Sequence, residues 1–131
     1  MDVPVASCLH RKLRRMERYV RASEISSKAQ VILKRGFAEI VGCYRNDRGT
    51  EDDWIVFTTN GISAVFDGEW RSIPYSEIRR VVREKTKDVD ADEITLELRS
   101  MSRATFVVNG KDPERGTHDK YLIMMFLDHV I

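Results

Sequence analysis

The sequence predicts an α+β fold in which helices flank a run of short antiparallel strands. Residues 1–36 carry apolar side chains at helical spacing, and residues 37–108 carry strand-like segments separated by turn formers. Residues 117–131 return to helical spacing. The length of 131 residues suits one core, because domains most often run to about 100–150 residues.

An amphipathic basic helix is predicted near the N-terminus. Its apolar side chains recur every three or four residues and form one stripe, with Ser7 as the expected N-cap. The stripe consists of Leu9, Leu13, Met16 and Val20. A second helix is predicted over residues 25–33, and an extended segment there is the alternative.

Seven short strands are predicted in the middle of the chain. Asn60-Gly61 and Asp67-Gly68 favour type I′ turns, so the second, third and fourth strands should lie antiparallel and adjacent. The sixth strand alternates cleanly, with Ile94, Leu96 and Leu98 on one face and Thr95, Glu97 and Arg99 on the other. The strands span residues 37–44, 54–58, 62–66, 69–73, 78–83, 94–99 and 104–108.

A strongly apolar helix is predicted after Thr117, its expected N-cap. Apolar side chains surround most of this helix, which predicts that it is heavily buried. Seven strands that form two sheets or a partly open barrel leave one end uncovered. The terminal helix is therefore expected to plug that end.

Two sequence runs carry a resemblance to a known superfold. They are FTTNGI at residues 57–62 and WRSIPYSEI at residues 70–78. With the strand order, they make residues 37–131 similar to the pleckstrin-homology-like superfold, in particular its bacterial and GRAM-related branches. The resemblance implies a seven-stranded antiparallel, partly open barrel capped by a C-terminal helix. Residues 1–36 have no counterpart there and are interpreted as a basic helical extension.

The net charge of +1 conceals an uneven distribution. The first 35 residues hold nine Lys and Arg against three Asp and Glu, so the remaining residues are net acidic. This basic segment could contact phosphates of lipid or nucleic acid. Alternatively, it could dock on the acidic part of its own chain or of a second copy.

The candidate binding residues are all basic and belong to two segments. The helical segment contributes Arg11, Lys12, Arg14, Arg15, Arg18 and Arg21. The resemblance implies a second set, because basic residues near the first two strands bind phosphates in lipid-binding members of the superfold. Arg45 and Arg48 occupy that loop here, but nearby carboxylates oppose a polyanion, namely Asp47, Glu51, Asp52 and Asp53.

No catalytic residue, metal site or cofactor is predicted. Cys8 and His10 are two residues apart on a helix and therefore diverge, and Cys43 is expected to be a buried filler within a strand. Asp67 and Glu69 sit at a hairpin tip that the turn signal already explains. A hydrolase is the weakest of the functional hypotheses.

The preferred interpretation is a non-catalytic protein-interaction module, of the kind found in small regulatory or immunity proteins. It would bind a protein partner or self-associate, with a homodimer through the N-terminal helices as one form. The alternative is a peripheral module that binds anionic lipid or nucleic acid through the basic helix. Apolar runs shorter than the roughly 20 residues of a membrane span and the absence of a signal peptide favour the cytoplasm.

Overall fold

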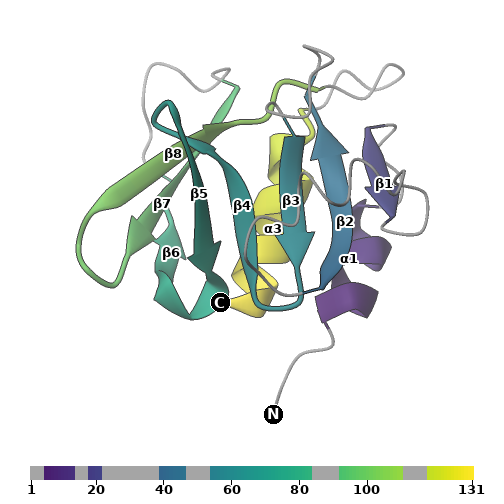
Figure 1. Ribbon diagram of the computed structural model, residues 1–131, viewed down its shortest axis with the longest axis horizontal. Helices are drawn as coiled ribbons and strands as arrows, with labels where there is room; N and C mark the ends of the chain where they lie inside the picture. The colour runs from purple at the N-terminus through teal and green to yellow at the C-terminus, as the bar shows by residue number, and fades with distance from the viewer. Residues whose placement is uncertain (1–4, 14–17, 22–38, 47–53, 84–91, 111–117) are drawn as a thin grey trace.

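The computed structural model describes residues 5–13, 18–21, 39–46, 54–83, 92–110 and 118–131, and they form an α+β fold (Figure 1). The strands make two antiparallel sheets, and a helix follows them at the C-terminus. In chain order the elements are α1 (Val5–Leu13), β1 (Tyr19–Arg21), β2 (Ile40–Arg45), β3 (Trp54–Thr58), β4 (Gly61–Phe66), β5 (Glu69–Pro74), the 3₁₀ helix η3 (Tyr75–Glu77), β6 (Ile78–Val81), β7 (Glu93–Leu98), β8 (Arg103–Val107) and α3 (Lys120–Val130).

The two sheets follow the chain closely. Strands β1 to β5 form one sheet in sequential order, and β6 to β8 form the other. Each pair of neighbours is antiparallel, as the sequence predicts, and the sheets do not close into a continuous barrel. In Figure 1, α3 lies behind the larger sheet and α1 lies beside it, under β1 and β2.

The main core is built from side chains of both sheets and both helices. Phe126 of α3 packs edge-to-face on Phe57 of β3, with ring centroids 5.5 Å apart. Phe66 of β4 meets Phe106 of β8 at 5.3 Å, which joins the two sheets. Burying each such ring contributes about 1.5–3 kcal/mol, so the apolar inner faces determine how the layers stack. The described helices are too short and insufficiently apolar to cross a membrane.

The N-terminal helix belongs to this core, but it is shorter than predicted. Leu9 and Leu13 of α1 are fully buried beside α3, which confirms the apolar stripe in its first part. Val20, expected on the same helix, instead lies in β1 and pairs with Cys43 of β2, because pairing extends the sheet. Ser7 lies inside the helix rather than at its cap, since Val5 packs against the core and the helix begins there.

The first predicted hairpin turn forms one residue earlier than expected. Gly61 is already in β4, opposite Pro74, and neither it nor Asn60 has a positive φ, so the type I′ prediction is wrong here. The reason is Thr58, whose Oγ1 accepts a hydrogen bond from the Gly61 amide at 3.0 Å and fixes the turn. The second predicted turn is confirmed, because Asp67 and Gly68 have φ values of 51° and 88°.

A buried polar contact fixes the start of α3. The hydroxyl of Tyr44 on β2 donates to Asp119 Oδ2 at 2.8 Å, and the Asp119 amide donates to the Gly110 carbonyl at 3.0 Å. Burial and then the bond to Asp119 raise the pKa of Tyr44. Asp119 is the N-cap residue of α3, whereas the predicted cap, Thr117, lies outside the described residues. The predicted helix over residues 25–33 lies outside them as well.

Candidate functional site

The predicted basic residues do not gather on one helical face. Arg11 is exposed on α1, and Arg21 is exposed on the edge strand β1. Arg18 lies between those elements, and its Nη1 donates to Asn109 Oδ1 at 2.9 Å, which ties it to the segment after β8. The described structure extends neither to the Lys12 side chain nor to Arg14, Arg15 and Arg48.

Arg45 stands apart from the N-terminal arginines at the end of β2. Its guanidinium lies over the Trp54 ring, 6.0 Å from the centroid, which is the geometry of a cation–π contact. The four carboxylates that the sequence places in the adjoining loop lie beyond the described residues. Arg45 is therefore positioned by an aromatic ring on the outer face of the larger sheet.

A different group of arginines lies on the outer face of the smaller sheet. We call it the arginine surface, and it consists of Arg79, Arg80, Arg99 and Arg103. The alternation predicted for β7 is confirmed, because Ile94, Leu96 and Leu98 all enter the core. Their neighbours, including Glu97 and Arg99, consequently belong to the outer face.

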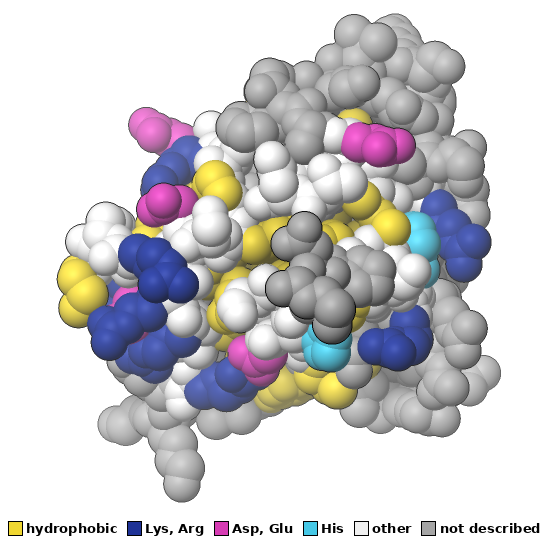
Figure 2. Space-filling model, turned by 90° about the horizontal axis from the view of Figure 1, so that it is seen from below, with side chains coloured by type: hydrophobic (Ala, Val, Ile, Leu, Met, Phe, Trp, Pro, Cys, Tyr) yellow, Lys and Arg dark blue, Asp and Glu magenta, His cyan; other side chains and the backbone are white. Residues whose placement is uncertain are grey.

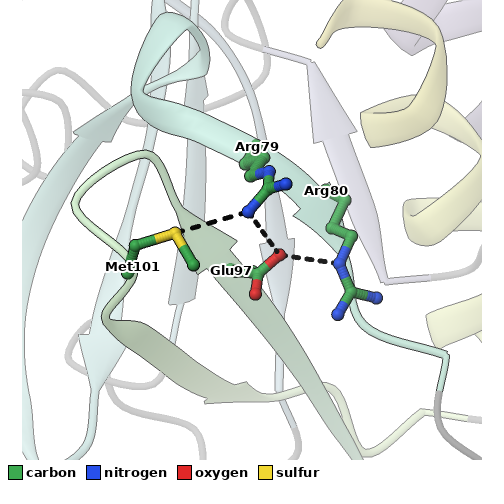
Figure 3. A network of polar contacts seen from close by, with 4 residues as sticks. All are labelled: Arg79, Arg80, Glu97 and Met101. Carbon is green, nitrogen blue, oxygen red and sulfur yellow. Dashed lines mark hydrogen bonds and ion pairs between the residues drawn. The ribbon is translucent and has the colours of Figure 1, made fainter.

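A bulge in β6 explains why two consecutive arginines share this surface. The pairing register of β6 and β7 shifts between Ile78 and Arg80, so that one extra residue is accommodated on β6. Such a bulge places two successive residues opposite one partner residue. Arg79 and Arg80 therefore both approach the carboxylate of Glu97, as Figure 3 shows.

Glu97 is the centre of the cluster. Arg80 Nε donates to Glu97 Oε2 at 2.7 Å, and Arg79 Nη1 lies 3.9 Å from the same oxygen. Arg103 pairs with Glu97 across β7 and β8. The hydrogen bond from Arg80 is the main cause of a lowered pKa at Glu97, and the charges of all three arginines reinforce it. The carboxylate remains ionised and holds the guanidinium groups together.

Two of the arginines are held in a way that leaves their outer nitrogens available. Arg80 uses Nε for Glu97, and its terminal nitrogens point away from that carboxylate (Figure 3). Arg99 likewise uses Nε, which donates to the Ser76 carbonyl at 2.7 Å. Neither terminal pair has a hydrogen bond to the residues that the structure describes. A guanidinium held through Nε presents a fixed pair of donors, which matches a carboxylate or a phosphate.

An exposed methionine completes the site at the tip of the β7–β8 hairpin. Met101 is 65 % exposed and has a φ of 71°, a left-handed conformation that the tight turn requires. Arg79 Nη1 lies 3.3 Å from its sulfur (Figure 3). The site therefore combines cationic donors with one apolar side chain.

The charge of this face is positive even when its acidic neighbours are counted. Glu77, exposed in η3, borders Arg99 through a backbone hydrogen bond, and Glu93 lies on the same outer face of β7 as Glu97. Among the described residues, four arginines therefore stand against Glu77, Glu93 and Glu97. Arg83, which follows β6, is neutralised by an ion pair with Asp128 of α3. Seen from below in Figure 2, Lys and Arg side chains gather at the left, where Figure 1 places the smaller sheet.

The sequence contained part of the signal for this surface. The alternation of β7 placed Glu97 and Arg99 on one face, but Arg79 and Arg80 are consecutive and were not assigned to a common face. Only the bulge brings them together, and no turn former or glycine marks it in the sequence. The net charge was also uninformative, because the arginines of the smaller sheet belong to the part of the chain after residue 35, which is net acidic.

Nucleophilic chemistry is not organised around either cysteine. Cys43 is buried in β2 as predicted, and burial raises the pKa of its thiol to about 12, so the thiolate is scarcely populated near neutral pH. Cys8 is buried in α1. Groups of three or more metal-ligating side chains are absent from the residues that the structure describes. The arrangement is suited to binding anions.

Comparison with known proteins does not assign the chain to a family. No family model matches it, and neither the curated proteins nor the solved structures contain a match.

Proposed function

We propose that this chain is a non-catalytic protein-interaction module that binds an acidic segment of a partner protein through the arginine surface. The observation that carries the proposal is the pre-positioning of Arg80 and Arg99, each held through Nε with its terminal nitrogens available. Donors that are fixed before binding lose less conformational entropy when a carboxylate arrives. The arginines of the site and Met101 are exposed, which makes them accessible to an extended segment.

The chemistry of the site favours a protein partner over a partner that is bound through charge alone. Met101 adds an apolar contact beside the guanidinium groups, and methionine adapts its shape to varied apolar side chains. A segment that alternates acidic and apolar side chains would use both features. The positive charge of the surface favours an acidic partner.

The fold is consistent with the pleckstrin-homology-like assignment, which we include in the proposal. Four of the predicted strands form a meander from β2 to β5, and three more form the second sheet. The terminal helix α3 packs against both β6 and β7 as a plug would. The same proposal places the protein in the cytoplasm, where the thiols of Cys8 and Cys43 would remain reduced.

A peptide-binding experiment tests the function directly. The probe is a short fluorescein-labelled peptide of glutamates with one central leucine, measured by fluorescence anisotropy at low and high salt. Binding should weaken as salt rises, because the contacts are charge-assisted and exposed. Arg80→Gln and Arg99→Gln should each weaken it about fivefold, since a net hydrogen bond contributes about 1 kcal/mol.

The matched control is Arg71→Gln. Arg71 is exposed on β5 of the other sheet, so its loss alters the net charge equally without touching the arginine surface. The control should bind the peptide as the unaltered protein does. If all three variants weaken binding equally, only net charge matters and the assigned surface is wrong. Stronger binding to phosphatidylserine vesicles than to the peptide would instead support the anionic-lipid alternative.

A further inference from the structure

We propose that Met101 is an oxidation site whose sulfoxide engages Arg79 and weakens the hold of the arginine surface on an acidic segment. This inference rests on the function proposed above. It adds a modification site to that binding surface, together with the class of reactant, a hydroperoxide. Two observations carry it, namely the exposure of the thioether and the guanidinium nitrogen beside its sulfur.

The position of Met101 makes its sulfur accessible. The side chain is 65 % exposed, at a hairpin tip where the backbone is left-handed. Met125 on α3 is also exposed, at 48 %, whereas Met124 packs partly against the core. Among these three methionines, Met101 alone has a guanidinium nitrogen recorded within hydrogen-bond reach of its sulfur.

The reaction is a two-electron transfer of oxygen. A sulfur lone pair attacks one oxygen of hydrogen peroxide, a sulfur–oxygen bond forms, and the oxygen–oxygen bond breaks. The second oxygen leaves with both hydrogens as water, so sulfur is oxidised and the peroxide is reduced. Arg79 Nη1, 3.3 Å from the sulfur, can donate a hydrogen bond to the departing oxygen as negative charge develops on it.

The product changes the surface in two ways. A sulfoxide oxygen is a much stronger hydrogen-bond acceptor than a thioether sulfur, so it would engage the Arg79 guanidinium that now lies only loosely against Glu97, at 3.9 Å. Oxidation also converts the apolar tip into a polar one. An acidic segment with an apolar side chain would consequently lose one donor and one contact.

The first experiment measures oxidation itself. The intact protein is treated with hydrogen peroxide, and mass spectrometry of its peptides follows each methionine separately. Met101 should oxidise several-fold faster than Met125. Arg79→Ala should slow oxidation of Met101. Because the substitution removes a neighbouring side chain, it cannot lower the exposure of the sulfur, so slower oxidation would reflect the loss of the guanidinium. Unchanged or faster oxidation of Met101 in that variant would overturn the assisting role of Arg79.

The second experiment measures binding of the glutamate–leucine peptide before and after peroxide treatment. Oxidation should weaken binding about tenfold, which corresponds to about 1.4 kcal/mol. Met101→Leu is the matched control, because leucine preserves an apolar tip that peroxide cannot oxidise; its binding should survive treatment. Equal affinity of the oxidised and untreated protein would refute this inference while leaving the proposed function intact. Absence of binding in the untreated protein would instead refute the proposed function.

Discussion

Glu97 is a carboxylate on a solvent-facing side of a sheet, yet it is only 9 % exposed because arginine side chains cover it. Its role is to bring like charges together. Without it, Arg79, Arg80 and Arg103 would repel one another, since guanidinium groups remain charged at any ordinary pH. One acidic residue thus makes a cationic surface possible at this place.

Replacing this carboxylate should change both stability and binding. Glu97→Gln should lower the free energy of unfolding at neutral pH. The lowered pKa means that the stabilising carboxylate is present above the ordinary glutamate pKa and is lost as the pH falls through the lowered value. The difference between variant and unaltered protein should therefore shrink in acid. Urea unfolding at several pH values measures it.

The control for that substitution is Glu93→Gln. Glu93 is exposed at the other end of β7, opposite Val107, and forms no recorded ion pair within the described chain. Its replacement should leave the pH dependence of unfolding nearly unchanged. Glu97→Gln should in addition bind the acidic peptide less tightly, because Arg80 loses the carboxylate that fixes its guanidinium. A stability difference that is constant with pH would contradict the role assigned to Glu97.

At the scale of elements, a glycine allows the start of β4 to pair closely with the end of β5. A Cβ on Gly61 would lie 2.6 Å from the Ile73 carbonyl oxygen and 3.0 Å from the Pro74 Cα. Both are backbone atoms of β5, so they cannot move aside as a flexible side chain would. The close approach, rather than a positive φ, is what requires glycine here.

Gly61→Ala should therefore destabilise the protein by about 1–3 kcal/mol through overpacking. The midpoint of urea unfolding, at unchanged slope, gives the measurement. Gly68→Asn is the matched control, because no atom lies within 4 Å of a Cβ there and asparagine tolerates a positive φ. If Gly61→Ala proved as mild as the control, the hairpin would have to be less closely packed than the structure shows.

Elements with strong periodicity were predictable, and those set by tertiary contacts were not. All seven predicted strands are present, and their observed ends lie within a few residues of the predicted ones. Alternation and turn formers specify these strands locally. β1 was missed, since Val20 continues a helical stripe in sequence and becomes a strand only by pairing with β2. The arginine surface was missed for a similar reason, because the bulge at Arg79 depends on the partner strand.

At the scale of the whole molecule, one core contains side chains from both the first and the last described helix. Leu9 and Leu13 of α1 belong to the same buried cluster as Phe126 and Leu127 of α3. The N-terminal segment expected to be an extension therefore contributes to the core that the strands build. The described part of its apolar stripe is used within the chain, and Arg11 of the same helix is exposed.

Leu13→Ala should accordingly cost about 2–5 kcal/mol, the range for a large-to-small change at a fully buried site. Chemical denaturation followed by tryptophan fluorescence would report it. The control on the same helix is Ser7→Ala, an exposed position where the effect should stay within about 0.5 kcal/mol. Equal stability of the two variants would mean that α1 does not pack as part of the core in solution.

The contact between α1 and α3 also constrains the order of events on the ribosome. Leu9 and Leu13 are synthesised early, but the aromatic and aliphatic side chains that they pack against emerge only with α3. Until then, the apolar side chains of α1 lack the part of their packing that α3 provides. Because α1 and α3 are far apart in the sequence, their contact requires closure of a long loop, and we expect it to form late in folding.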